Sequence, residues 1–285
     1  MEIFENRLKI LVVLYKKKIY ESETILSIIK YKHELRSVDS VVIWNNSPCP
    51  LSLNEKRKIE KEMEPVCIGF EGDDGVNHNL PFIYTNMYES STDSDILVIF
   101  DHDSNIHSDY FSELLEATKI YKNINLFLPI IYSGRFIVSP SYMFVVKGLY
   151  WKHTHFGILK AKHITAINSG MAIRCRYLKN DFKGYNMNLK FYETDNDFMY
   201  KYNQDNVSLY VLKSSINHTL DFYDGKDIDN KLERFVAMRQ GRLDRMKTIN
   251  YLFYVLSFTQ YLYFGIKCAL KYKEYRFIRL AFVKR

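Results

Sequence analysis

Two aspartates separated by one residue, Asp101 and Asp103, directly follow the apolar run Ile96–Phe100. Five consecutive apolar residues with polar neighbours on both sides predict a short strand that is buried on both faces. Because side chains alternate along a strand, we expect both carboxylates on one side and His102 on the other. Two carboxylates this close repel each other unless a cation lies between them, and oxygen ligands favour Mg²⁺ or Mn²⁺. The alternative is a polar turn that caps the next helix.

Strands and helices alternate along the part of the chain that leads up to and follows this pair. Strands are expected at residues 9–15, 37–44, 66–70 and 96–103, and helices at 22–31, 52–63, 80–90 and 108–121. This alternation predicts an α/β fold with a mostly parallel sheet and flanking helices. Ligands of such sheets bind outside the carboxyl ends of the strands. Those ends are Tyr15, Asn45–Asn46, the loop 71–74 and the aspartate pair, so we expect all four to face one crevice.

The second half of the chain is less regular. Strands are expected at residues 124–131, 135–146, 164–175 and 207–212, several of them antiparallel. Asn168-Ser169-Gly170 interrupts one of these strands, at a point where the backbone can approach a ligand closely. The segment Glu193–Asp197 opens an amphipathic helix, and its acidic residues interact favourably with the helix dipole. His218 follows the last strand.

The composition restricts the class of protein. A chain of 285 residues, 47% of them hydrophobic, is long enough and apolar enough for a full core. The four cysteines are scattered, which argues against a zinc site or a disulfide framework and favours a reducing cytosol. The apolar run at residues 10–14 is too short for a signal peptide. A net charge of +7 implies an acidic partner such as a nucleotide, a nucleic acid or an anionic membrane.

From about residue 226 the chain becomes basic and aromatic. The apolar stretch 251–266 is shorter than the roughly 20 residues that a membrane-spanning helix needs. The basic residues that follow it are Lys267, Lys271, Lys273, Arg276, Arg279, Lys284 and Arg285. An aromatic face with a basic flank is typical of a helix in the interface of an anionic membrane. The alternative is a helix hairpin that packs on the domain.

The order of these motifs resembles that of family 2 glycosyltransferases of the GT-A fold, and of their bacterial rhamnosyltransferase-like branch. The aspartate pair followed by Ser104 is similar to the end of that branch's central strand. Residues 79–86 resemble its Asn-Leu-Gly…Asn segment, and residues 168–173 its acceptor-side segment. Residues 194–198 resemble its Glu-Asp-x-Asp-Leu motif. The resemblance covers residues 8–220, approximately.

Three positions refine this resemblance. His218 falls where many members of the family place a histidine that completes the metal shell. Pro81 replaces the glycine of the Asn-Leu-Gly segment, which is also one residue shorter here. Thr194 replaces the usual glutamate, which leaves one negative charge fewer beside Asp195.

The resemblance implies an inverting transfer of a sugar from a UDP- or dTDP-sugar to a saccharide or lipid-linked acceptor, in the synthesis of bacterial surface polysaccharide such as O-antigen or capsule. Mn²⁺ or Mg²⁺ held by Asp101, Asp103 and His218 would neutralise the leaving diphosphate. Asp195 would act as the base that takes the proton of the acceptor hydroxyl. The implied acceptor-side residues are Asn168, Ser169, Gly170 and Asp197.

The ends of the first two strands are expected to hold the nucleotide. Tyr15 could stack on a pyrimidine, although it could also be a simple strand-end aromatic residue, and Asn45 or Asn46 could bond the edge of the base. The family often has an aspartate near this turn, so the choice between uracil and thymine stays open. The nucleotide-binding candidates are Leu14, Tyr15, Asn45, Asn46, Asp73, Asn79, Asn86 and His102.

These expectations give a domain plan and a location. Residues 1–225 would form the GT-A domain, with a nucleotide-binding half to about residue 105 and an acceptor-side half from 106, and residues 226–285 a helical extension. We expect the protein in the cytoplasm, in peripheral contact with anionic lipid at the inner face of the plasma membrane. No nucleic-acid partner is expected.

Three other classes of protein predict different features in this sequence. A sugar nucleotidyltransferase should have a glycine-rich phosphate loop after its first strand, but residues 15–20 contain no glycine. A haloacid-dehalogenase-type phosphatase places its aspartates at the first strand, and residues 11–15 offer none. A non-catalytic membrane or polyanion-binding module would use the positive charge and be indifferent to the aspartates.

Overall fold

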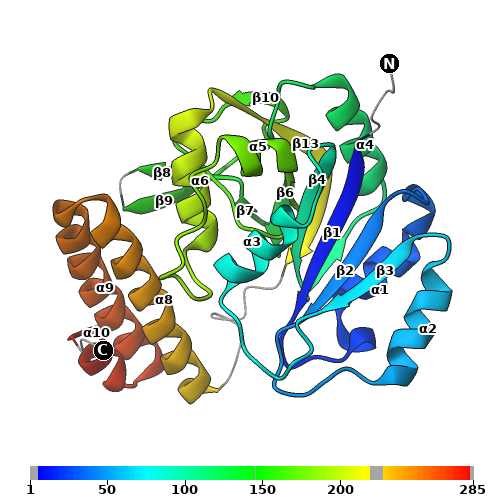
Figure 1. Ribbon diagram of the computed structural model, residues 1–285. Coiled ribbons are helices and arrows are strands. Elements are labelled where there is room, and N and C mark those ends of the chain that lie inside the picture. Colours follow the sequence, from blue (N-terminus) through cyan, green and yellow to red (C-terminus); the bar gives the residue numbers. More distant parts are fainter. Residues whose placement is uncertain (1–5, 145, 219–226, 283–285) are drawn as a thin grey trace.

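The computed structural model describes residues 6–144, 146–218 and 227–282 (Figure 1). Within these ranges a ten-stranded sheet has the order β10-β13-β6-β12-β4-β1-β2-β3, with β5 paired to β13 and β7 to β6. Its strands are β1 (Arg7–Leu14), β2 (Ser40–Asn45), β3 (Cys67–Glu71), β4 (Asp95–Asp101), β5 (Ser104–Ile106), β6 (Leu126–Ser133), β7 (Phe136–Ser139), β10 (Gly157–Lys160), β12 (Met171–Arg174) and β13 (Ser208–His218). A small second sheet, β11-β8-β9, consists of β8 (Ser141–Phe144), β9 (Lys147–Tyr150) and β11 (Ile164–Thr165).

The first four strands form a parallel unit with β1 between β2 and β4. β12 runs antiparallel to β4 and β6, while β13 is parallel to β6. The flanking helices are α1 (Glu23–Lys30), α2 (Leu53–Met63), α3 (Leu80–Glu89), α4 (Tyr110–Ile120), α5 (Cys175–Asn180) and α6 (Thr194–Asp205), with short 3₁₀ helices at Ile19–Glu21 and Lys32–Glu34. The predicted α/β fold with a mostly parallel sheet and flanking helices is confirmed.

The alternation of side chains along the strands divides the core into two layers, one on each face of the sheet. In β4, Leu97 and Ile99 pack with residues of α3, α5 and α6, whereas Ile96, Val98 and Phe100 pack with residues of α1, α2 and α4. Asp101 continues the Leu97–Ile99 series, so its backbone position directs its side chain toward the face that α6 covers. The sheet therefore determines which helices can contribute to a site at the end of β4.

Proline divides one of the predicted strands. Residues 135–146 form two strands, β7 and β8, that belong to different sheets and are separated by Pro140. Proline cannot donate a ladder hydrogen bond, so a continuous strand through this position is disfavoured. Residue 145, in the last part of the predicted strand, lies outside the described residues.

Three other predicted strands have different lengths. β4 ends at Asp101 because residues 102–103 form a turn, so alternation along the strand does not bring the two aspartates together. Residues 164–175 form two short strands, β11 and β12, with the expected interruption between them. β13 extends to His218, six residues beyond the predicted end, because it also pairs with β5.

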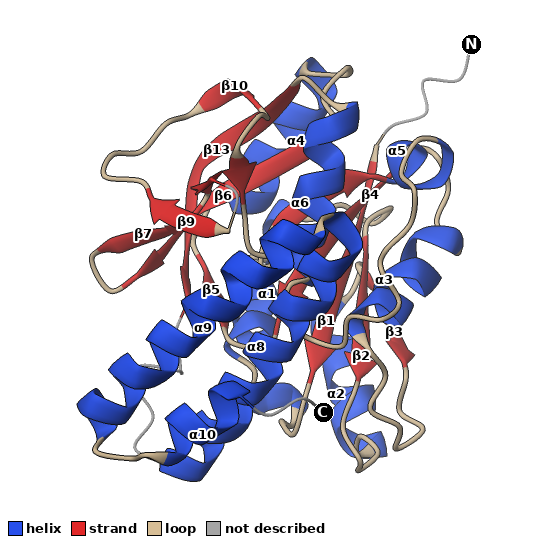
Figure 2. Cartoon of the chain, turned by 90° about the vertical axis from the view of Figure 1, so that its left-hand side faces the viewer, coloured by secondary structure: helices blue, strands red, loops and turns tan. Residues whose placement is uncertain are grey.

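The C-terminal helices form a bundle beside the sheet (Figure 2). They are α8 (Ile228–Ile249), α9 (Tyr251–Tyr272) and α10 (Arg276–Phe282), and their buried core is centred on Phe235 and Phe277. Gly241 permits close contact with the domain, since a Cβ atom there would lie 2.8 Å from the carbonyl oxygen of Tyr192. The predicted helical extension is confirmed. Its helices pack on the domain, as expected for the alternative of a packed helix hairpin.

The boundary expected at residues 225/226 and the basic residues Lys284 and Arg285 lie outside the described residues. No helix in the described ranges combines the length and the apolar character that crossing a membrane would require.

Arg174 connects β12 to the end of α4, and its loss should destabilise the fold. Its buried guanidinium donates to the carbonyl oxygens of Ile124 (2.7 Å), Thr118 (2.7 Å) and Tyr121 (3.1 Å). Arg174→Met removes these three buried hydrogen bonds, although the carbonyl oxygens of Thr118 and Tyr121 each keep one other partner, so we expect urea unfolding to show a loss of about 2–4 kcal/mol. The exposed Arg176→Met is the control and should change stability by less than about 0.5 kcal/mol. Equal stability of the two variants would contradict this role.

Candidate active site

Three potential metal ligands meet at the carboxyl end of β4. Asp101 is the last residue of β4, Asp103 lies in the following turn, and His218 is the last residue of β13. One ligand atom from each of the three lies within 4.8 Å of the other two. The closest approach described is 3.5 Å, between Nδ1 of His218 and Oδ1 of Asp103. The structure thus brings together the three residues that were predicted to hold a metal.

The chemistry of this cluster fits a divalent cation. Asp103 Oδ1 and His218 Nδ1 are buried and have no hydrogen-bond partner. Unpaired buried polar atoms cost free energy, and a cation between them would remove that cost. Burial raises the pKa of Asp103; His218 opposes this effect and the Asp101 carboxylate adds to it. Two carboxylates suit Mn²⁺ or Mg²⁺.

The turn that carries the aspartates is held by two buried hydroxyl groups at the start of α1. Thr24 Oγ1 donates to the carbonyl oxygen of Asp101 (2.5 Å) and accepts from the backbone N–H of Ser104 (2.9 Å). Ser22 Oγ donates to the carbonyl oxygen of His102 (2.8 Å). Both side chains are completely buried. These bonds fix the backbone between the two aspartates in one conformation.

The loop before β12 connects Asp101 to α6. Ser169 Oγ donates to Oδ2 of Asp101 at 3.1 Å. Asn168 Nδ2 donates to the hydroxyl groups of Tyr84 (3.1 Å) and Thr194 (3.2 Å). Thr194 is the first residue of α6, so the threonine in this motif accepts a hydrogen bond from Asn168 where a glutamate would bring a charge. The two acceptor-side candidates Asn168 and Ser169 therefore link both halves of the site.

Gly170 and Asp197, the other acceptor-side candidates, make structural contacts. Gly170 has a φ of 76°, its carbonyl accepts from the Tyr110 hydroxyl at 2.7 Å, and an added Cβ would collide with Ile216. Asp197 is 3% exposed and forms an ion pair with Lys201 at 2.8 Å. Both residues support the backbone around the site.

Asp195 lies in the first turn of α6, where Oδ1 accepts from the backbone N–H of Asn196 at 2.7 Å. Burial raises the pKa of Asp195 to about 7, with further upward contributions from the Glu193 and Asp101 carboxylates and a downward one from Arg245. A carboxylate that titrates near neutral pH can accept a proton from a bound hydroxyl group. The geometry places this candidate base within the electrostatic influence of the metal cluster.

Glu193 is the residue that connects the C-terminal helices to this base. It precedes α6 with a φ of 71°, a left-handed conformation that is unfavourable for residues other than glycine. Its Oε2 accepts from Arg242 (3.1 Å) and Arg245 (2.9 Å), both on α8. These buried ion pairs hold the backbone at the start of α6, two residues before Asp195.

The loops beyond β2 and β3 are braced by residues that were predicted to contact the nucleotide. Asn45 Nδ2 donates to Asp73 (2.6 Å), and Asn46 exchanges hydrogen bonds with the backbone of His78 (2.7 and 2.9 Å). Although burial favours protonation of Asp73, hydrogen bonds from Lys56 and Asn45 lower its pKa. The amide groups of both asparagines are thus occupied within the protein, and they shape the rim of the crevice.

Tyr15, another of the nucleotide candidates, is accessible to solvent. It is 38% exposed, and its ring centroid lies 6.5 Å from that of Phe191. Leu14 is fully buried, and its carbonyl accepts from the backbone N–H of Asn46 at 2.8 Å. His102 is half-buried in the turn between the two aspartates.

Asn79 and Asn86 lie on α3. Asn79 caps the helix by accepting from the backbone N–H of Phe82 at 2.9 Å. Asn86 is exposed and donates to the Phe82 carbonyl oxygen at 2.9 Å. Asn79 therefore serves the helix start, and Asn86 makes its described bond within the same helix.

The residues that position the site were not predicted from the sequence. Ser22 and Thr24 are ordinary at a helix start, and only their spacing next to a predicted helix hinted at a cap. Arg242 and Arg245 stand among many basic residues of the C-terminal segment, so charge alone did not distinguish them. Their partner Glu193 was visible only as part of an acidic helix start.

No protein-family model and no curated protein sequence matches this chain. Solved structures do resemble it, and they define the class of fold: the parallel β1–β4 unit with an acidic pair after β4 belongs to the GT-A fold. Two of these solved structures each match most of this chain.

One is GalNAc-T7, solved with UDP, GalNAc and Mn²⁺, with a TM-score of 0.52 and 10% identity over 75% of this chain. The match spans only 44% of the GalNAc-T7 chain. The other is S. aureus TarS (residues 1–349), with a TM-score of 0.54 and 12% identity over 96% of this chain and 90% of that one. At sequence identities of 10% and 12%, these two structures are evidence for a shared fold alone.

Asp195→Asn should stabilise the protein in a pH-dependent way. Because the pKa of Asp195 is raised, its ionised form costs folding free energy that is absent below the ordinary aspartate pKa and complete above pH 7. We therefore expect the variant to raise the melting temperature, by a larger margin at pH 8 than at pH 5. Asp205→Asn, at the exposed end of the same helix, should shift the melting temperature equally at both pH values. A gain for Asp195→Asn that does not grow with pH would refute the raised pKa.

Proposed function

We propose that this chain is a metal-dependent, inverting glycosyltransferase of the bacterial rhamnosyltransferase-like branch. It would move a sugar from a UDP- or dTDP-sugar to a saccharide or lipid-linked acceptor in the synthesis of bacterial surface polysaccharide such as O-antigen or capsule. The observation that carries the proposal is the cluster of Asp101, Asp103 and His218 at the end of β4, next to Asp195 with its near-neutral pKa. The GT-A fold supports the same conclusion.

The metal ligands are positioned before any substrate arrives. A divalent cation, Mn²⁺ or Mg²⁺, bound at this cluster would supply positive charge for the leaving diphosphate. Asp103 and His218 offer their unpaired buried atoms to it, and Ser169 orients the carboxylate of Asp101. Because Thr24 holds the turn through two hydrogen bonds, the aspartates need little reorganisation when the charge develops.

Asp195 would receive the proton of the acceptor hydroxyl. The hydroxyl oxygen attacks the anomeric carbon while the bond from that carbon to the diphosphate breaks, which inverts the configuration in a single displacement. Asp195 must be ionised for this step, so the rate should rise as the pH approaches and exceeds about 7. Glu193 contributes to this by raising the pKa of Asp195, which makes the ionised form a stronger base.

In this proposal one half of the domain binds the donor and the other half contributes the acceptor side. Residues 1–105 bind the donor, with the exposed Tyr15 stacking on the base and Asn45, Asn46 and Asp73 shaping the rim around it. Residues 106–225 contribute the acceptor side through the loop before β12 and the start of α6. The C-terminal helices hold the start of α6, where Arg242 and Arg245 of α8 pair with Glu193.

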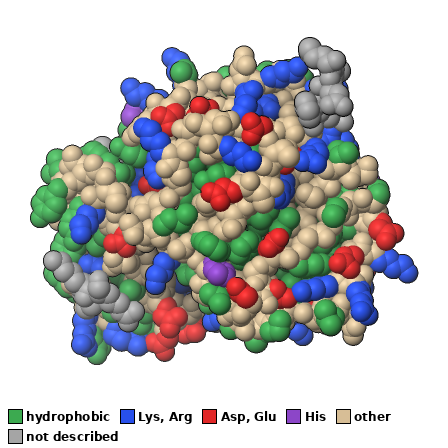
Figure 3. Space-filling view, in the orientation of Figure 1, with side chains coloured by type: hydrophobic (Ala, Val, Ile, Leu, Met, Phe, Trp, Pro, Cys, Tyr) green, Lys and Arg blue, Asp and Glu red, His purple; other side chains and the backbone are tan. Residues whose placement is uncertain are grey.

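The exposed side of α9 supports peripheral contact with an anionic membrane, which we place at the cytoplasmic face of the plasma membrane. Its apolar side chains are spaced so that they share one helix face. They are Leu252, Leu256, Tyr263, Ile266 and Leu270, each at least 41% exposed. Hydrophobic side chains gather over these helices at the left of the molecule (Figure 3). Lys267 and Lys271 are exposed on the same helix and can attract anionic headgroups.

Calorimetric titration with UDP and with dTDP tests the donor site. In the presence of Mn²⁺ we expect one of them to bind, and chelation by EDTA or the variant Asp103→Ala to weaken binding by at least about tenfold. The preferred base then narrows the range of donors. Asp93→Ala removes an exposed aspartate at the opposite end of β4 and should bind like the unmodified protein. Failure of folded protein to bind either nucleotide would refute the transferase proposal.

Sedimentation with lipid vesicles tests the membrane contact. Leu256→Glu with Tyr263→Glu places two charges on the apolar side of α9, so binding to phosphatidylglycerol vesicles should fall several-fold. Val207→Glu changes an apolar residue that is 84% exposed elsewhere and should leave binding unchanged. If the unmodified protein and both variants bind equally, the exposed side of α9 does not contact the membrane and this part of the proposal is wrong.

A further inference from the structure

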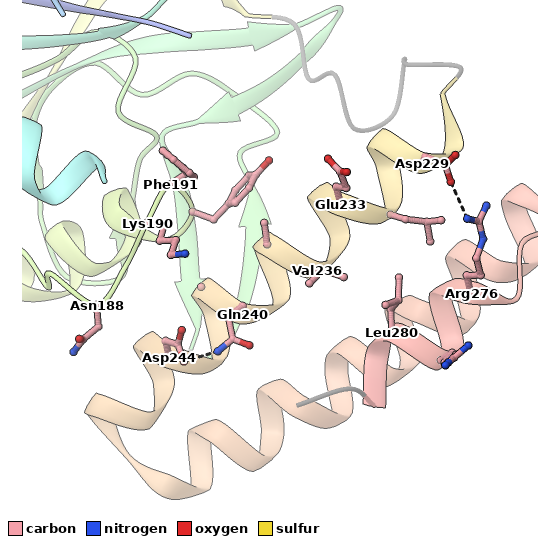
Figure 4. A pocket seen from close by; sticks show the side chains of 15 residues that line it. Asn188, Lys190, Phe191, Asp229, Glu233, Val236, Gln240, Asp244, Arg276 and Leu280 are labelled. Atoms are coloured by element: carbon pink, nitrogen blue, oxygen red, sulfur yellow. Dashed lines mark hydrogen bonds and ion pairs between the residues drawn. The ribbon is translucent and has the colours of Figure 1, made fainter. Parts of the chain in front are cut away.

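Two cavities border the C-terminal helices, and their polar groups differ. The larger, of about 950 Å³, lies between residues 188–192, α8 and α10 (Figure 4). Three of its charged groups have partners in the protein: Asp229 pairs with Arg276 at 2.8 Å, and Asp244 accepts from Gln240 at 2.7 Å. None of the proposed metal ligands or Asp195 is among its lining residues. Within the described residues, none of the buried polar atoms that lack a hydrogen-bond partner belongs to the lining of this cavity.

The second cavity, of about 450 Å³, lies on the other side of α8, between the small sheet and the C-terminal helices. This volume is in the range of small-molecule sites, which measure about 300–1,000 Å³. Its wall combines aromatic rings with amide, hydroxyl and guanidinium groups. The residues of interest are Tyr150, Thr165, Asn196, Arg242, Gln260 and Phe264.

Two side chains in this wall have polar atoms without partners. Nε of Arg242 and Oε1 of Gln260 are buried and make no hydrogen bond. A buried donor and a buried acceptor left unpaired next to a cavity cost free energy that a polar ligand can recover. The terminal amide of Gln260 turns about a soft torsion, so its oxygen can rotate toward a ligand in the cavity. A ligand that serves both groups must accept one hydrogen bond and donate another, as a hydroxyl group does.

The cavity is directly connected to the candidate base. Asn196, one of its lining residues, follows Asp195 and donates its backbone N–H to that carboxylate. Thr165, another lining residue, donates to Oδ1 of Asn196 at 2.7 Å. Arg242 lines the cavity and also binds Glu193, two residues before Asp195. A molecule in this cavity would therefore contact the helix turn that carries the base.

We propose that this cavity binds a sugar unit of the saccharide acceptor, with Gln260 and Arg242 contacting its hydroxyl groups and Tyr150 packing against its ring. Saccharides are the substrate class that offers paired donor and acceptor groups together with apolar C–H faces suited to aromatic rings. This inference rests on the proposed transferase function. It extends the acceptor side from the loop before β12 and the start of α6 to residues of the small sheet and of α8 and α9.

Saturation-transfer NMR with a panel of methyl glycosides tests the site, with Mg²⁺ as a diamagnetic ion and both with and without UDP. We expect at least one glycoside to receive saturation from the unmodified protein. Gln260→Leu removes the unpaired acceptor, and Tyr150→Ala removes an aromatic ring that is 62% exposed and so can be deleted without opening the core. Each variant should reduce the transfer by about fivefold while UDP binding stays unchanged.

Thr259→Leu and Tyr251→Ala are the matched controls, because both change exposed residues of α9 that do not line the cavity. They should behave like the unmodified protein. If no glycoside receives saturation, or if the cavity variants and the controls give equal transfer, the acceptor assignment is wrong although UDP may still bind. If glycosides depend on Gln260 and Tyr150 but neither UDP nor dTDP binds, the saccharide site stands and the transferase function fails.

Discussion

The active site depends on holding two carboxylates and an imidazole within 4.8 Å of one another. Like charges at this distance repel, so the protein must stabilise the arrangement from several elements at once. Thr24 from α1 fixes the turn, Ser169 from the loop before β12 bonds Asp101, and the pairing of β13 with β5 brings His218 alongside. None of these contacts neutralises the carboxylates, and the atoms left without partners are those that face a potential cation. The scaffold therefore holds three potential ligands in a geometry that fits a divalent cation.

A second electrostatic constraint governs the base. Burial and two neighbouring carboxylates raise the pKa of Asp195, and Glu193 is itself buried. Glu193 is tolerated because Arg242 and Arg245 pair with it; without α8 its charge would be buried alone, which is strongly unfavourable. Gly241 allows α8 to approach closely enough for both arginines to reach. The C-terminal helices thus belong to the candidate active site, since they determine the charge and the backbone conformation beside the proposed base.

Periodicity and motif order predicted the parallel half of the sheet and the metal cluster, because these depend on local patterns: an apolar strand, an acidic pair and a histidine after a late strand. They failed where distant contacts decide the outcome. Pro140 divides a strand whose β-propensity is otherwise continuous, and β13 extends to His218 because its last residues pair with both β5 and β6. Asn45 and Asn46 are polar residues at a strand end, as a nucleotide site requires, and the hydrogen bonds by which their amides also brace neighbouring loops were not predicted. Which partner a polar side chain chooses cannot be inferred from its own position in the sequence.

The surface of α9 suggests how acceptor binding and location could be coupled. Gln260 and Phe264 line the cavity beside α6, whereas Leu256 and Tyr263 are exposed on the same helix. Residues three or four apart are neighbours on a helix surface, so Gln260 adjoins Leu256 and Tyr263, and a membrane that contacts these exposed residues lies close to the proposed acceptor site. A lipid-linked saccharide could then enter the cavity while its lipid remains in the bilayer. A soluble saccharide acceptor would not need the apolar side, and the exposed leucines would then carry a solubility cost without a compensating function.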